Sequence, residues 1–183
     1  MYKFPKTERG LRSRIASYKA SMQKERRTFG AIDDSYGKRY IIFWLYFVLN
    51  DLKGGGAYIR WYEKTFEDDI GEPLQKLCCA LLLKRLGDES KAKYVLADLM
   101  LMNLFLIPKL IGEKANVPYQ KYGSNRADES YANEIPEEIA GAISKEESAW
   151  MKELYDSTEF HRYRKRYLEI SQELENTHGV EKR

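Results

Sequence analysis

Two histidines, His161 and His178, are the only imidazole groups in the chain, so a Ser-His-Asp or Cys-His arrangement would depend on one of them. His178 falls in the expected C-terminal tail, and His161 adjoins Arg162 on a charged helix face, which favours a surface position. The sequence contains no HExxH, CxxC, GxGxxG or phosphate-loop pattern. We therefore predict no catalytic residue, no metal ligand and no cofactor, and a protein that is not an enzyme.

Four carboxylates, at Glu67, Asp68, Asp69 and Glu72, cluster in an expected loop between helices. Such groups can hold Mg²⁺ or Ca²⁺ or act as acid and base. Their spacing does not fit a calcium loop, so we predict a solvated loop at a helix end. An enzyme with an unfamiliar site, using tyrosines and carboxylates, is a less favoured alternative. Gly54–Gly56 lacks the Gly-Lys-Ser/Thr ending of a phosphate loop and predicts a turn.

Cys78 and Cys79 are adjacent, and neighbours on a helix point about 100° apart, which does not suit an ordinary disulfide. They are expected to be small buried residues in a reducing cytoplasm. The apolar runs at 40–49 and 95–107 are shorter than the roughly 20 residues of a membrane-spanning helix. We therefore predict a cytoplasmic protein without a membrane partner.

The composition is that of a single helical domain of 183 residues. Hydrophobic residues make up 43% and charged residues 32%, and proline occurs only five times. The predicted fold is therefore all-α. The expected helices cover residues 8–27, 38–52, 57–66, 73–86 and 89–106, then segments resuming near 129 and 136, a helix after the Ser144/Glu147 capping box, and 158–175.

Two helical pairs recur at a spacing of 35 residues. Ala57 and Ala92 are separated by 35 residues, each just inside a second helix, and Pro73 and Pro108 repeat the interval. Helix–turn–helix units recurring near 34 residues are typical of tetratricopeptide repeats. A small residue is required wherever two such helices approach closely.

Residues 38–111 thus resemble two degenerate tetratricopeptide units. The second fits better: Ala80, Gly87 and Ala92 match its small-residue and turn positions. In the first, Trp61 matches the aromatic site and Leu45 replaces the small residue. A generic helical bundle with a chance repeat remains the alternative.

The resemblance implies a right-handed stack of α-hairpins, flanked by an N-terminal helix in 1–30 and capping helices in 128–176. Residues 112–127 are expected to form a loop and 177–183 a tail. In this family the first helix of each hairpin lines a groove for a protein or peptide partner. Transferred by register, the predicted groove residues are Arg39, Tyr46, Asn50, Leu77, Leu81, Lys84 and Arg85.

Arginine, lysine and asparagine donors beside tyrosine suit an acidic or carboxylate-bearing peptide. The predicted function is therefore an adaptor or scaffold that binds a protein or peptide, with homo-oligomerisation as a further option. The alternative is nucleic-acid binding, which the basic composition of residues 1–30 suggests, since they carry nine Lys/Arg against two Glu. Nucleic acid is the less favoured of the two partners. Its candidate residues are Arg12, Arg14, Lys19, Arg26 and Arg27.

Overall fold

The fold is all-α. A computed structural model describes residues 2–34, 36–115, 117 and 124–180, and within them it contains ten α-helices, one 3-10 turn and no strand. The elements are α1 (Glu8–Phe29), α2 (Lys38–Leu49), α3 (Leu52–Thr65), α4 (Pro73–Arg85), α5 (Glu89–Met102), α6 (Leu106–Ile111), η1 (Asn125–Ala127), α7 (Glu129–Asn133), α8 (Glu137–Ala142), α9 (Lys145–Asp156) and α10 (Thr158–Val180).

Most helix starts follow from short-range capping chemistry. Thr7 accepts a hydrogen bond from the Gly10 amide, and Pro73 occupies the first position of α4, where no backbone N–H is needed. Ser144 and Glu147 form the predicted capping box at the start of α9. The predicted starts at Glu8, Lys38, Pro73 and Glu89 are therefore confirmed.

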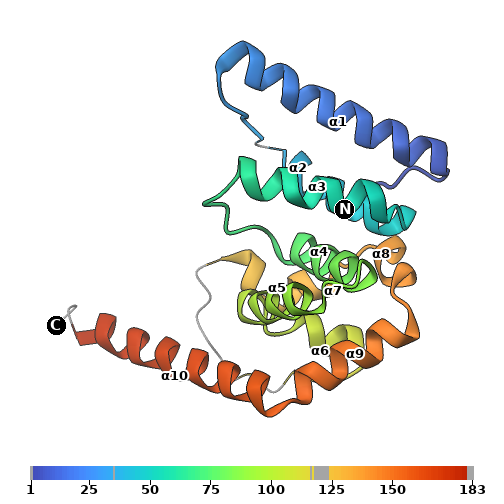
Figure 1. The fold of residues 1–183 in the computed structure, drawn as a ribbon. Helices are drawn as coiled ribbons and strands as arrows, with labels where there is room; N and C mark the ends of the chain where they lie inside the picture. The colour runs from blue at the N-terminus through green and yellow to red at the C-terminus, as the bar shows by residue number, and fades with distance from the viewer. Residues whose placement is uncertain (1, 35, 116, 118–123, 181–183) are drawn as a thin grey trace.

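The centre consists of two helical pairs of closely similar length. Helices α2 and α3 have 12 and 14 residues, and α4 and α5 have 13 and 14. Helix α4 packs against α2 and α3 as well as against α5. Figure 1 shows α1 lying on the outer side of the α2–α3 pair, while α6 to α9 surround α4 and α5 on the other side.

The triple glycine is not the turn that the sequence indicated. Gly54–Gly56 lies within the first turns of α3, and the chain reverses at Asn50 and Asp51. Asn50 adopts a left-handed conformation with φ of 53°, and the Asp51 side chain accepts a hydrogen bond from the Gly54 amide at 2.9 Å. An Asn C-cap followed directly by an Asp N-cap thus replaces the expected glycine turn.

The alanine pair that suggested the repeat does not occupy equivalent surroundings. Ala92 is completely buried, whereas Ala57 is exposed. The close approach on α3 occurs at Gly55, where an added Cβ would lie 3.2 Å from Leu82 Cδ2 of α4. The matching of Ala57 with Ala92 was therefore wrong, although the leading helices α2 and α4 do lie side by side.

Asn103 ends α5 four residues before the predicted end. Its side-chain oxygen accepts hydrogen bonds from the Phe105 and Leu106 amides, and this starts the short helix α6. Pro108 is the third residue of α6, where its missing N–H removes no intrahelical bond. Of the predicted loop, residues 116 and 118–123 lie outside the described part of the chain, and 125–127 form a 3-10 turn.

Helix α10 is longer than predicted and does not cap the other helices along its length. Only Phe160 of its apolar stripe is fully buried, whereas Ile170 and Leu174 are exposed by 40% and 55%. In Figure 1 the C-terminal half of α10 extends away from the other helices. Residues 177–180 of the predicted tail belong to this helix, and 181–183 are outside the described part.

None of the helices in the described ranges has the length and apolar character needed to cross a bilayer.

Candidate peptide-binding site

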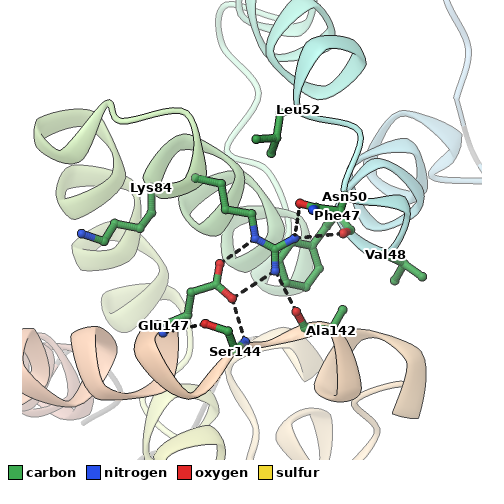
Figure 2. A pocket seen from close by; sticks show the side chains of 9 residues that line it. Phe47, Val48, Asn50, Leu52, Lys84, Ala142, Ser144 and Glu147 are labelled. Atoms are coloured by element: carbon green, nitrogen blue, oxygen red, sulfur yellow. Dashed lines mark hydrogen bonds and ion pairs between the residues drawn. The ribbon is translucent and has the colours of Figure 1, made fainter.

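Three of the seven predicted groove residues meet at one pocket. Asn50, Lys84 and Arg85 line a pocket of about 570 Å³ at the C-terminal ends of α2 and α4. Its remaining walls come from the end of α2, the start of α3 and the α8–α9 junction, as Figure 2 shows: Phe47, Val48, Leu52, Ala142, Ser144 and Glu147. The pocket therefore combines an apolar side, formed by the first hairpin, with a polar side.

Arg85 uses all five of its N–H donors inside the protein. Its Nε donates to Glu147 Oε1 at 2.8 Å, and its Nη2 donates to Glu147 Oε2 at 3.0 Å and to the Ala142 carbonyl at 2.7 Å. Its Nη1 donates to the Phe47 carbonyl at 3.3 Å and to Asn50 Oδ1 at 3.0 Å. Since a guanidinium has five donors, none is left for an external carboxylate.

Glu147 already supplies the carboxylate that Arg85 was expected to receive from a peptide. Its side chain is almost fully buried, and its Oε2 also accepts a hydrogen bond from the Ser144 amide at 2.8 Å. The bidentate pair therefore joins α4 to the first turn of α9. Arg85 stabilises the pocket wall, which corrects its predicted role as a free peptide-binding group.

Lys84 is the more available cation of the pocket. It forms an ion pair with Glu89, whose side chain is 68% exposed, and its ammonium group lies 5.4 Å from the centre of the Trp150 ring. The Lys84 side chain is itself 27% exposed, so the pair is only partly solvated. An external carboxylate that replaced Glu89 would keep the Lys84 ammonium group paired.

Arg39 lies in a separate, internal cluster. Its Nε donates to Asp69 Oδ2 at 2.6 Å, and its Nη2 donates to the Tyr40 hydroxyl at 2.7 Å. Asp69 also accepts hydrogen bonds from the hydroxyls of Tyr40 at 2.7 Å and Tyr62 at 3.0 Å. Arg39 therefore ties the start of α2 to the loop before α4 and takes no part in the pocket.

The other predicted groove residues also lie outside the pocket. Leu77 and Leu81 are completely buried core residues of α4 and expose no surface to a peptide. Tyr46 is almost fully buried and faces α1, where it lines a second pocket of about 410 Å³ together with Arg12 and Lys19. On α2, the helices α1 and α8 cover faces that a stack of two hairpins without them would leave open.

The acidic loop is less solvated than predicted. Glu67 and Asp68 are exposed, but Glu72 is buried and caps α4 by accepting hydrogen bonds from the Leu74 and Gln75 amides. Burial raises the pKa of Glu72 to about 7, although these two hydrogen bonds oppose the shift. Asp69 and Glu72 therefore serve separate structural roles. Among the described residues, no group of three or more Asp, Glu, His or Cys is placed to hold a metal ion.

The pKa of Asp69 lies below its ordinary value. Burial alone would raise this pKa, but the hydrogen bonds from Tyr40 and Arg39 stabilise the carboxylate and outweigh the effect of burial. The adjacent cysteines are buried free thiols, as predicted, and desolvation raises the pKa of Cys79 to about 12. His161 is exposed, again as predicted.

The basic residues of α1 are only partly available. Arg12 is paired with Glu8 and with Asp51, and Arg14 donates to the Tyr18 hydroxyl at 3.3 Å. Lys19 is half-buried in the pocket beside Tyr46, whereas Arg26 and Arg27 are exposed in the last turn. Of the five candidate residues, Arg12 and Arg14 thus contact groups of the protein itself, whereas Arg26 and Arg27 face solvent.

The α8–α9 junction is the part of the pocket that the sequence analysis missed. The capping box of Ser144 and Glu147 was recognised, but capping uses backbone amides within one turn and carries no information about the distant Arg85.

Comparison of the chain with protein-family models, with curated proteins and with solved structures gives no match in any of the three.

Proposed function

We propose that this chain is a non-enzymatic, cytoplasmic protein- or peptide-binding module built on two stacked tetratricopeptide-like hairpins. The observation that carries the proposal is the pocket at the C-terminal ends of the leading helices α2 and α4. The matched lengths of the two hairpins and the packing of α4 against both helices of the first hairpin support the repeat interpretation.

The chemistry of the pocket favours a peptide that carries an acidic side chain next to an apolar one. Val48 and Leu52 are half-buried and offer an apolar wall, and Lys84, whose partner Glu89 is exposed, lines the same pocket. Asn50 is exposed at the rim and adds an amide group. Arg85 supports this arrangement from behind without contacting the ligand, because its donors are occupied.

Selection from a random peptide display library tests this proposal directly. Peptides enriched on the immobilised protein are expected to contain Asp or Glu beside an apolar residue, and their affinity can be measured by fluorescence anisotropy. Lys84→Glu reverses the charge at the pocket and should weaken binding by about tenfold or more. Lys24→Glu, on an exposed position of α1, changes the net charge equally and should leave the affinity nearly unchanged.

Absence of any enriched peptide, or equal loss with the two variants, would contradict the pocket as the binding site. Nucleic-acid binding through α1 is the second candidate: Arg26 and Arg27 are exposed, whereas Arg12 and Arg14 contact groups of the protein itself. That alternative would gain support if labelled DNA or RNA bound with an affinity that fell steeply with salt.

A further inference from the structure

Helix α10 presents an apolar stripe that its own chain leaves partly uncovered. The stripe consists of Tyr163, Tyr167, Ile170 and Leu174, and the three residues Tyr163, Ile170 and Leu174 are exposed by 38%, 40% and 55%. Figure 1 shows the C-terminal half of α10 lying apart from the remaining helices. A helix that projects in this way normally gains its stability by packing its apolar face on a partner.

The spacing of the stripe is that of a coiled-coil seam. Phe160, Tyr163, Tyr167, Ile170 and Leu174 follow at alternating steps of three and four, so they occupy the a and d positions of a heptad, while Leu168 lies outside this seam beside Tyr155. Phe160, the first of them, is buried against the body of the protein, and the free seam therefore begins at Tyr163.

We propose that α10 pairs with α10 of a second copy of this chain in an antiparallel coiled coil. In such a pair an a residue of one helix faces a d residue of the other, so Tyr167 meets Ile170 of the second copy and Leu174 meets Tyr163. A two-fold axis generates each contact twice, so four apolar layers form from one stripe.

The charges beside the seam are self-complementary in this orientation. Arg166 and Glu173 both occupy g positions, and antiparallel pairing in the register given above places Arg166 opposite Glu173 of the second copy, twice over. Both side chains are well exposed, at 61% and 68%; within its own helix Arg166 contacts Glu169 at 3.4 Å and Glu173 at 3.8 Å, and exposed pairs of this kind exchange readily. Both are therefore accessible to a second copy. In a parallel pair the two g residues would not face each other.

Multi-angle light scattering of the full chain at about 50 µM tests the proposal. The expected mass is twice the 21.5 kDa of one chain, and Ile170→Lys should reduce it to a single chain because it places a charge in the seam. Lys165→Glu lies on the opposite side of α10, in the pocket beside Glu113 and Tyr155, and should leave the dimer unchanged. A monomeric wild-type protein, or a dimer indifferent to Ile170→Lys, would overturn the proposal.

A charge exchange tests the antiparallel register. Arg166→Glu and Glu173→Arg are each expected to shift the dimer toward monomer, because each brings like charges together across the seam. The combined variant restores opposite charges and should restore the dimer. A combined variant as weak as either single variant would overturn the antiparallel arrangement. Circular dichroism of all variants confirms that helix content is unchanged.

Discussion

Arg85 and Glu147 are separated by 62 positions in the sequence and form a bidentate ion pair, with N–O distances of 2.8 and 3.0 Å. The pair joins the last turn of α4 to the first turn of α9. It is also the point at which the C-terminal helices close the pocket of the first two hairpins. The stability of the whole C-terminal half should therefore depend on it.

We expect Arg85→Ala to lower the free energy of unfolding by about 3–5 kcal/mol, because it leaves the buried carboxylate of Glu147 without its cation. Urea denaturation followed by circular dichroism measures the change. Arg9→Ala, at an exposed position of α1, is the control and should change stability by less than about 0.5 kcal/mol. A loss below about 1 kcal/mol for Arg85→Ala would show that the pair contributes little.

Asp69 should make the protein sensitive to acid. Its pKa in the folded state lies below the ordinary value of 3.8, so its contribution to stability is present above that value and is lost as pH falls toward the lower folded pKa. Asp69→Asn removes the ion pair with Arg39 and should cost about 2–4 kcal/mol at pH 7. The same denaturation series with Asp68→Asn, an exposed neighbour, should show almost no change.

Glu72 should have the opposite pH dependence. Its folded pKa of about 7 lies above the ordinary 4.5, so between these values the folded state binds more protons than the unfolded state. Its contribution is therefore largest below pH 4.5 and falls by about 3 kcal/mol as pH rises through 7.

Glu72→Gln keeps an oxygen that can cap α4 and removes this titration. The stability of the variant relative to the wild type should therefore rise between pH 5 and pH 8. Glu67→Gln, in the same loop but exposed, provides the baseline. Parallel stability curves for Glu72→Gln and the wild type over this range would refute the assignment.

Glycine replacement distinguishes close packing from helix propensity. An added Cβ at Gly54 would lie 2.5 Å from Tyr46 Cε1, so Gly54→Ala should destabilise the protein by about 1–3 kcal/mol despite the better helix propensity of alanine. Gly141 in α8 has no atom within 4 Å of its added Cβ. Gly141→Ala should therefore stabilise the protein by up to about 1 kcal/mol, as measured by thermal unfolding.

Local chemistry made the helical class and most helix starts predictable from the amino-acid sequence. The capping box of Ser144 and Glu147 and the proline at the start of α4 act within one helical turn, so their effect does not depend on distant contacts. The triple glycine misled for the same reason. Glycine is common in turns, but here it serves the close approach of α3 to Tyr46 and Leu82.

The roles of the predicted binding residues depended on which helix faces became covered. Arg39 of α2 and Arg85 of α4 were both predicted to bind a peptide. Arg39 instead pairs with Asp69, and Arg85 pairs with Glu147, each from another segment of the chain. Leu77 and Leu81 are buried because α4 is surrounded on almost every side.

The apolar stripe of α10 was visible in the sequence, but its exposure was not. The spacing of apolar residues along a helix indicates that one face is apolar. Whether that face is covered depends on how the other helices pack. The sequence alone therefore determined the helical class and most helix starts, since capping and periodicity act over a few residues. The tertiary structure decided which charges are free and which faces remain open, because those depend on segments far apart in the chain.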